Sequence, residues 1–131
     1  MDYKLLADKA VEAKSKAFPP YSNFHVGAAL LTEDNKIYSG CNVEVSSYSL
    51  TICAERNAVF KAVSEGERKF TAIAIASDEE NFCPPCGACR QVLQDLCGSE
   101  IDIIMINQKK ELKIMKLAEL LPLPFGDSNL K

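Results

Sequence analysis

The sequence of 131 residues has no tryptophan, one histidine and no long apolar run. No apolar run approaches the roughly 20 residues that a membrane-spanning helix needs, and the N-terminus lacks the pattern of a secretion signal. We therefore expect a cytoplasmic protein with no membrane partner. The single histidine, His25, follows Phe24 in an alternating pattern, so it belongs to the opposite face of a strand. We expect a structural or surface role for it.

Positive charge is also scarce. The chain has 15 Lys and Arg against 18 Asp and Glu, a net charge of -3 and a pI of about 5.2. Proteins that bind nucleic acids neutralise phosphates with clustered Lys and Arg, so we expect no nucleic-acid partner and a small or neutral substrate. Repeats, low-complexity tracts and linkers are absent, and this length fits one domain over residues 1–131.

Apolar periodicity predicts nine elements in the order αββαβαββα. The expected ranges are 6–17, 24–30, 36–43, 53–63, 72–77, 86–97, 101–106, 111–116 and 117–121. Thr51 is a plausible N-cap for the second helix, and Gly98 can end the third. Strands that alternate with helices in the middle of the chain predict a three-layer α/β/α fold, with a mixed sheet of about five strands covered by helices.

Six cysteines are present, and without a secretion signal they favour metal binding or redox chemistry over disulfides. Cys53 opens one predicted helix, while Cys86 and Cys89 lie at i and i+3 at the start of another, where Cys89 belongs to the apolar stripe and is expected to face inward. Helix N-termini favour thiolates, and three thiolates leave a fourth zinc position for water, as in catalytic sites. We therefore expect one Zn²⁺ per chain, bound by these three cysteines.

Two charged residues follow Cys53 directly in the segment Cys53-Ala54-Glu55-Arg56. Glu55 is too near Cys53 in sequence to be a comfortable ligand of the same ion, but it can reach a bound water, so we assign it the general base and acid. Three thiolates give the metal more negative charge than neutral imidazoles would. Hydrogen bonds from Arg56 to the thiolates would offset that charge.

These motifs, together with the segments 21–29 and Cys41-Asn42-Val43-Glu44, resemble the cytidine deaminases that have three cysteine ligands. The resemblance covers nearly the whole chain. It implies hydrolysis of cytidine and 2′-deoxycytidine to the corresponding uridines with release of ammonia, in pyrimidine salvage. In that reaction Glu55 passes protons from water to N3 of the base and then to the leaving amino group.

The resemblance also implies the residues that bind the substrate. Phe24 stacks on the pyrimidine, Asn42 and Glu44 bind the ribose 3′-hydroxyl, and the backbone of Ala54 helps to read the base. Phe125 resembles an aromatic residue that enters a neighbouring subunit's site, which implies a homotetramer with shared active sites.

Four further positions bear on these details. Tyr48 is expected at the subunit interface. Val45, Pro84 and Asp127 differ from the family pattern, and they concern substrate contacts and subunit contacts.

Other interpretations remain open. Cys83 extends the cluster to Cys83-x-x-Cys86-x-x-Cys89, which would suit a closed four-cysteine structural zinc site. The pair Cys86-x-x-Cys89 alone would suit a redox motif. A deaminase of the same fold could act on another cytosine nucleoside such as blasticidin S, or, less readily for an acidic chain, on a polynucleotide. Cys41 and Cys97 are expected to be small buried residues.

Overall fold

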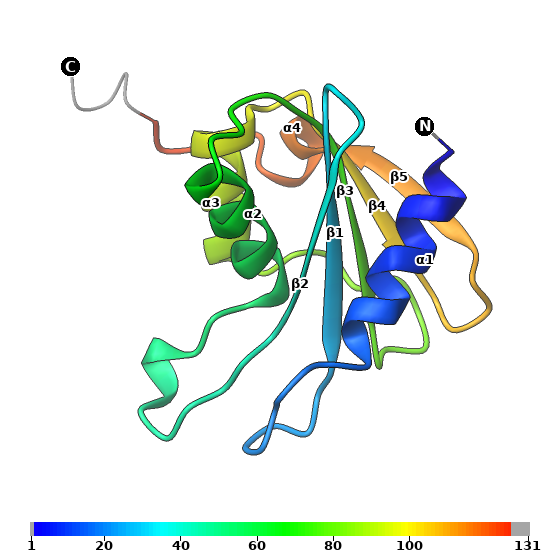
Figure 1. The fold of residues 1–131 in the computed structure, drawn as a ribbon, viewed down its shortest axis with the longest axis vertical. Helices are drawn as coiled ribbons and strands as arrows, with labels where there is room; N and C mark the ends of the chain where they lie inside the picture. Colours follow the sequence, from blue (N-terminus) through cyan, green and yellow to red (C-terminus); the bar gives the residue numbers. More distant parts are fainter. Residues whose placement is uncertain (1, 127–131) are drawn as a thin grey trace.

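The computed structural model describes residues 2–126, and a five-stranded mixed sheet runs through their centre (Figure 1). The strands are β1 (Val26–Thr32), β2 (Ile37–Cys41), β3 (Phe70–Ser77), β4 (Asp102–Ile106) and β5 (Leu112–Lys116). They lie in the order β2-β1-β3-β4-β5. Only β3 and β4 are parallel, and α3 lies between them in sequence, as a crossover connection requires.

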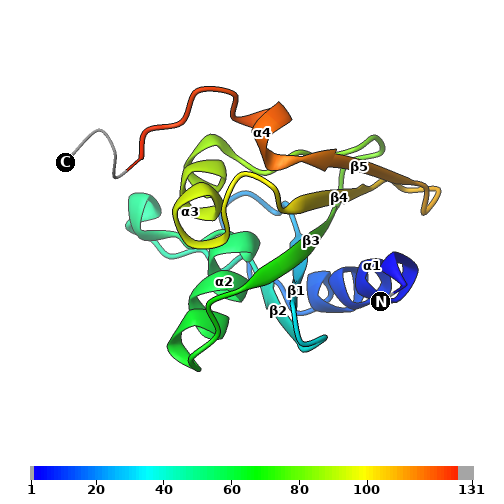
Figure 2. The ribbon, with the colours of Figure 1, turned by 90° about the horizontal axis from the view of Figure 1, so that it is seen from above.

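Helices cover both faces of this sheet. The helices are α1 (Tyr3–Lys14), α2 (Ala54–Ser64), α3 (Gly87–Cys97) and α4 (Leu117–Leu120), with a 3₁₀ turn at Tyr48–Leu50. In the view from above, α1 lies on one side of the sheet and α2 and α3 lie on the other (Figure 2). The predicted three-layer α/β/α fold with a mixed sheet is confirmed.

Each central strand contributes to two apolar cores because successive side chains point to opposite faces. On β1, Ala28 and Leu30 belong to the core under α2 and α3, whereas Ala29 and Leu31 belong to the core under α1. Gly27 lies where α1 crosses the strand, and a Cβ there would be 2.1 Å from the Ala10 carbonyl oxygen. Small residues therefore let α1 pack closely on the sheet.

Several predicted boundaries differ from the structure by a few residues; α1 begins at Tyr3 and not at residue 6, and β1 begins at Val26 and not at residue 24. The first helix ends at Lys14 because its last turn tightens, with Ala17 N–H donating to the Lys14 carbonyl at 3.2 Å. The N-cap of α2 is Cys53, and Thr51 instead follows the 3₁₀ turn with an extended backbone. The helix thus begins one residue after a metal-ligand candidate, which places that thiol at the helix N-terminus.

The first turn of α2 is set by its contact with β2. A Cβ added to Gly40 would lie 2.7 Å from the Ala54 carbonyl oxygen and 2.6 Å from the Ala58 nitrogen. Only a residue without a side chain permits this approach. This contact fixes the position of the first turn of α2 relative to the sheet, and with it the positions of Cys53 and Glu55.

Within residues 2–126, none of the helices has the length and apolar character needed to cross a membrane.

Candidate active site

Two helix N-termini meet at one side of the sheet and bring three thiols together. Cys53 is the N-cap of α2, Cys86 is the N-cap of α3, and Cys89 lies in the first turn of α3. The Cys53 and Cys86 sulfurs are 3.6 Å apart, and the Cys86 and Cys89 sulfurs are 3.1 Å apart. Cys89 is fully buried, as its place on the helical stripe predicts, whereas Cys86 is exposed.

This geometry fits a tetrahedral metal ion. A Zn–S bond of about 2.3 Å with tetrahedral angles separates two sulfurs by about 3.8 Å. The three sulfurs lie within 4.8 Å of one another, so small movements would bring all of them into the shell of one ion. Three thiolates are a donor set typical of zinc, with one coordination position left for another group.

Hydrogen bonding among these thiols concentrates negative charge on Cys53. Hydrogen bonding from Cys89, aided by Arg56, lowers the pKa of Cys53 to about 5. The pKa of Cys89 is raised, because it holds the proton that it donates to Cys53 and because it is buried beside Glu55. Arg56 Nη2 lies 3.4 Å from the Cys53 sulfur and 3.4 Å from the Thr51 carbonyl oxygen. The contact expected between Arg56 and a thiolate is therefore present.

Glu55 lies beside this cluster, and its side chain is buried, with an exposed fraction of only 4%. Burial raises its pKa from 4.5 to about 7, and the nearby charge of Cys53 adds to the shift. The N-terminus of α2 aims Glu55 into the same cavity that Cys53 and Cys86 line. A carboxyl group with a pKa near neutrality can both accept and donate a proton at physiological pH.

In the metal-free protein, the contribution of Glu55 to the free energy of unfolding should fall as the pH rises. Glu55 titrates near 4.5 when unfolded and near 7 when folded, so the folded state binds the proton more tightly. This contribution is complete below pH 4.5 and is lost as the pH passes 7, a change of about 3 kcal/mol. The free energy of unfolding of metal-free Glu55→Gln, measured in urea, should therefore be about 3 kcal/mol higher than that of the metal-free wild type at pH 8. The two values should be equal near pH 4.5. An equal difference at both pH values would contradict this assignment.

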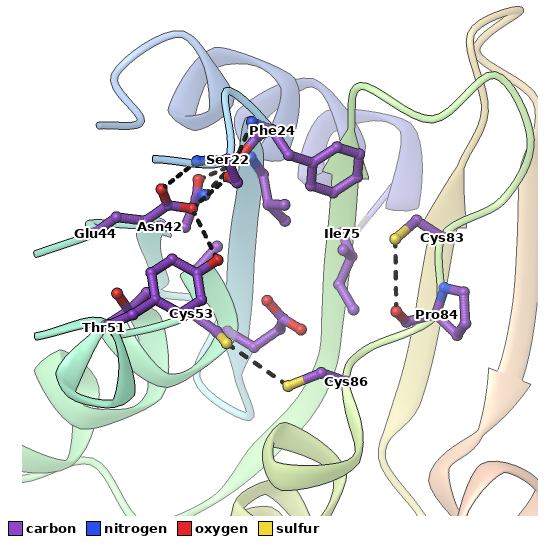
Figure 3. Close-up of a pocket in the computed structure, with 14 residues that line it drawn as sticks. Ser22, Phe24, Asn42, Glu44, Thr51, Cys53, Ile75, Cys83, Pro84 and Cys86 are labelled. Atoms are coloured by element: carbon purple, nitrogen blue, oxygen red, sulfur yellow. Dashed lines mark hydrogen bonds between the residues drawn. The ribbon is translucent and has the colours of Figure 1, made fainter. Parts of the chain in front are cut away.

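A cavity of about 280 Å³ lies over the thiols and brings four of the five predicted substrate residues to one place (Figure 3). Phe24, Asn42, Glu44 and Ala54 line it together with Glu55. Its volume is just below the usual range of small-molecule sites, about 300 to 1,000 Å³. The cavity therefore offers room for one small ligand between an aromatic side and a metal-binding side.

Asn42 and Glu44 already have protein partners in this cavity. The side chain of Asn42 accepts a hydrogen bond from Val26 N–H at 2.9 Å and donates one to the Phe24 carbonyl at 2.7 Å. Glu44 accepts hydrogen bonds from the backbone N–H groups of Tyr21 at 3.1 Å and Ser22 at 2.9 Å. Both side chains therefore organise the loop that carries Phe24, a function that their spacing in a strand did not indicate.

Glu44 carries its charge despite being buried. Burial alone would raise the pKa of Glu44, but hydrogen bonds from Ser22 and Tyr21 outweigh that effect and hold the pKa below its ordinary value. A further donor, the Tyr48 hydroxyl, lies 3.5 Å from its Oε2 atom. The cavity wall thus contains a fixed negative charge at Glu44.

Phe125 does not line this cavity. It lies beyond α4, is 56% exposed, and its carbonyl accepts a hydrogen bond from the side chain of Gln91. Asp127, one of the positions that differ from the family pattern, lies outside the described residues. Val45 is exposed, with its N–H 3.4 Å from Thr51 Oγ1, and Pro84 lies in the cavity wall.

The remaining cysteines lie apart from the three-sulfur group. Cys83 lines the cavity, but its sulfur contacts the Pro84 carbonyl at 3.6 Å and is not part of that group. Burial raises the pKa of Cys97 to about 12, and its side chain packs against the core as expected. Cys41 is only half-buried and donates to the Lys16 carbonyl.

Several cavity residues were not among the site residues predicted from the sequence. The wall also contains Ser22, Val26, Thr51, Ile75 and Pro84. Their residue types are ordinary in loops and strands, and only the fold brings them together. A buried carboxylate requires nearby hydrogen-bond donors. The contact between Glu44 and the hydroxyl of Ser22 is therefore the one that could have been predicted, had the burial of Glu44 been known.

The family can now be identified from comparisons with known proteins. A family model described as the cytidine and deoxycytidylate deaminase zinc-binding region matches residues 1–105. The cytidine deaminase of Sporosarcina psychrophila is 47% identical over 130 residues, which cover 99% of this chain and 96% of that protein. That of Mycobacterium tuberculosis is 39% identical over 130 residues, covering 99% and 94%. The crystal structure of cytidine deaminase from Burkholderia pseudomallei matches with a TM-score of 0.92 and 42% identity, over 95% of this chain and all of that one. The chain therefore belongs to the zinc-binding cytidine and deoxycytidylate deaminase family.

Proposed function

We propose that this chain hydrolyses cytidine and 2′-deoxycytidine to uridine and 2′-deoxyuridine and releases ammonia. The observation that carries the proposal is a buried carboxyl group, Glu55, with a pKa of about 7, beside three convergent cysteine thiols in one small cavity. A structural zinc site has no need of a proton carrier in that place. Hydrolysis of an amidine C–N bond needs one, because protons must move to the ring and to the leaving group.

The protein side chains divide this chemistry between them. Cys53, Cys86 and Cys89 would hold zinc, which when bound supplies a Lewis acid that promotes ionisation of water. Glu55 would take a proton from water and deliver it to N3 of the base, which makes C4 more electrophilic. After water oxygen adds to C4, Glu55 would carry a second proton to the amino group, so that the C4–N bond breaks and ammonia leaves.

Arg56 would keep this site electrophilic. Its Nη2 atom is within 3.4 Å of the Cys53 sulfur, and a guanidinium remains charged at every relevant pH. A hydrogen bond from a cation withdraws electron density from the thiolate and reduces the negative charge that three sulfurs place on the ion.

The substrate would lie across the cavity between Phe24 and the thiols. Phe24 provides an apolar face for the pyrimidine ring, and the backbone of Ala54 lies at the start of α2, where N–H groups are free to meet the base. Glu44 and Asn42 would bind the ribose 3′-hydroxyl at the opposite end. The long 3.5 Å contact between Tyr48 and Glu44 is the one that a sugar hydroxyl would most easily replace.

We further propose a homotetramer in which Phe125 completes the cavity of a neighbouring subunit. Phe125 is 56% exposed and lies outside its own cavity, and Tyr48 and Leu50 beside the cavity are exposed at 55% and 67%. Exposed apolar side chains of this size are typical of interfaces. The cytoplasmic location, expected from the sequence pattern, and the place in pyrimidine salvage, implied by the resemblance, both stay predictions.

One substrate series tests the proposed function. The purified chain should contain about one zinc per chain, and ultraviolet assays should find the highest kcat/KM for cytidine and 2′-deoxycytidine, with lower values for blasticidin S and single-stranded DNA. Faster turnover of blasticidin S would favour the antibiotic deaminase, and turnover of DNA would favour a polynucleotide deaminase. A zinc-loaded chain that deaminates none of the four would indicate a structural zinc module.

A further inference from the structure

The rim segment, residues 22–26, forms the side of the cavity that carries Phe24. The Phe24 N–H donates to Ser22 Oγ at 3.1 Å, and the Phe24 carbonyl accepts from Asn42 Nδ2 at 2.7 Å. The Val26 N–H donates to Asn42 Oδ1 at 2.9 Å, and its carbonyl accepts from the Asn42 N–H at 3.3 Å. Side chains therefore satisfy three of these four backbone groups, before the regular ladder of β1 begins.

Asp78, the first residue after β3, binds His25, the residue between Phe24 and Val26. Its Oδ2 atom accepts the His25 N–H at 2.7 Å and also lies 2.7 Å from His25 Nδ1, while the Asp78 N–H donates to the His25 carbonyl at 3.1 Å. A carboxylate can only accept, so Nδ1 carries the hydrogen in this contact. Asp78 thus supplies the partner of both backbone groups of His25, and the rim segment has no unpaired backbone group from Phe24 to Val26.

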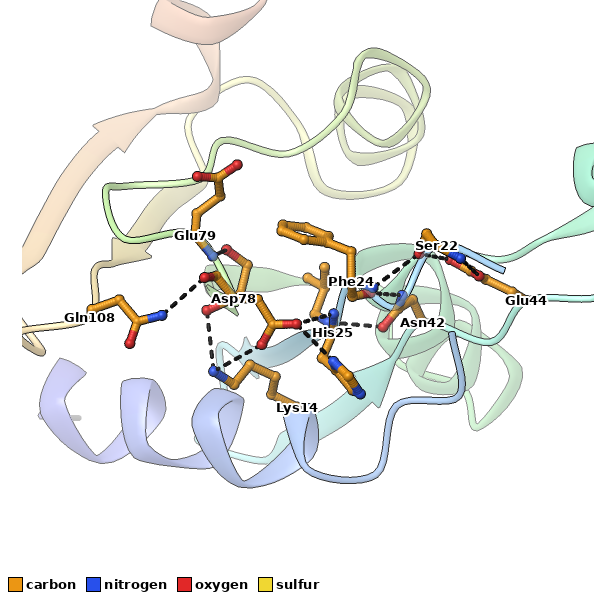
Figure 4. Close-up of polar contacts among 11 residues, drawn as sticks. Lys14, Ser22, Phe24, His25, Asn42, Glu44, Asp78, Glu79 and Gln108 are labelled. Carbon is orange, nitrogen blue, oxygen red and sulfur yellow. Dashed lines mark hydrogen bonds and ion pairs between the residues drawn. The ribbon is translucent and has the colours of Figure 1, made fainter. Parts of the chain in front are cut away.

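Asp78 is itself fixed from two other directions (Figure 4). Lys14 Nζ, at the end of α1, donates to the Ser77 carbonyl at 3.2 Å and lies 3.7 Å from Asp78 Oδ1. Gln108 Nε2, in the turn after β4, donates to the Asp78 carbonyl at 3.0 Å. Burial opposes ionisation of Asp78, but the hydrogen bonds from His25 outweigh it and hold its pKa below the ordinary value. A charged, anchored acceptor therefore faces the rim.

We infer that Asp78 is a positioning residue for substrate binding, which acts by fixing the backbone of His25 and so holding the Phe24 ring against the cavity. The inference rests on the proposed function, in which Phe24 contacts the base. A wall that is ordered before the substrate arrives lowers the conformational cost of binding. Glu55 is held by α2 and not by this contact, so losing Asp78 should weaken binding more than it slows chemistry.

Kinetics of single variants test whether Asp78 affects substrate binding and not the chemical step. Asp78→Ala should raise the KM for cytidine about tenfold and change kcat by less than about twofold, with zinc content unaltered. Asp78→Asn keeps an oxygen acceptor for the His25 N–H and should stay within about threefold of the wild-type KM. Glu79→Ala removes the neighbouring carboxylate of the same loop and should behave as wild type. A fall in kcat with unchanged KM in Asp78→Ala would overturn the inference.

Hydrogen exchange gives a readout that does not depend on activity. The amides of the rim segment should exchange faster in Asp78→Ala than in Glu79→Ala. His25→Ala keeps the backbone bond to Asp78 and should raise KM by less than about threefold, and the double variant should be no worse than Asp78→Ala alone, because both changes act through one contact. If the wild type deaminates cytidine but Asp78→Ala shows neither faster amide exchange in the rim segment nor a higher KM, the inference is overturned. A wild-type chain that does not deaminate cytidine would overturn the proposed function instead.

Discussion

Replacing Glu55 by Gln should lower kcat for cytidine by at least about a thousandfold and leave the zinc content near one per chain. The amide keeps the shape of the side chain but cannot take a proton from water or return one to the amino group. General acid and base catalysis contributes about 10²- to 10⁴-fold per transfer, and Glu55 serves more than one transfer in the proposed reaction. Steady-state ultraviolet assays with metal analysis of the same sample measure both quantities.

Glu65→Gln is the matched control. Glu65 is the exposed C-cap of the same helix, α2, so this change removes one carboxylate from the helix without entering the cavity. Its activity should equal that of the wild type. Retained turnover in Glu55→Gln would remove Glu55 from the reaction, whereas loss of zinc together with activity would mean that Glu55 supports the metal site and not the proton transfers.

The layers of the fold were predictable because each element contains its own periodic signal. Val26, Ala28 and Leu30 recur at every second position of β1, and all three belong to or pack against the core under α2 and α3. The stripe on α3 likewise predicted that Cys89 is buried. Such patterns depend only on the local geometry of a helix or strand, so they can be recognised without knowledge of the tertiary structure.

The proximity of the three thiols was predictable from chemistry more than from spacing. Cys86 and Cys89 are one helical turn apart, so their proximity follows from α3 alone. Cys53 is separated from them in sequence by α2 and β3, and only the tertiary fold brings the two helix N-termini together. The expectation that all three thiols share one ion came from what a catalytic zinc requires.

Contacts of the rim segment could not be predicted, because they join residues that are far apart in sequence and ordinary in type. Asp78 contacts His25 across 53 positions, and Asn42 contacts Phe24 across 18. Neither pair shows a spacing rule. The predicted N-cap of α2 was wrong for a related reason. Local preference favours Thr51, whereas the position of Cys53 is set by the packing of α2 on Gly40.

Replacing Cys89 by Ser should abolish both zinc binding and deamination. Cys89 is buried between Cys86 and Glu55, so no nearby water-exposed group can take its place. A serine hydroxyl rarely ionises and is a poor zinc ligand, so the loss of affinity should exceed the roughly 10- to 100-fold that removing a supporting hydrogen bond costs. Zinc content after dialysis, together with the rate on cytidine, measures the effect.

The comparison with Cys83→Ser separates a catalytic site from a closed structural one. Cys83 turns its sulfur to the Pro84 carbonyl and lies outside the three-sulfur group, so Cys83→Ser should keep about one zinc per chain. Cys41→Ser, whose hydroxyl can still donate to the Lys16 carbonyl, controls for the loss of one thiol and should keep both metal and activity. If Cys83→Ser loses its zinc as Cys89→Ser does, then four sulfurs surround the ion, no position is left for water, and hydrolysis at this site has to be abandoned.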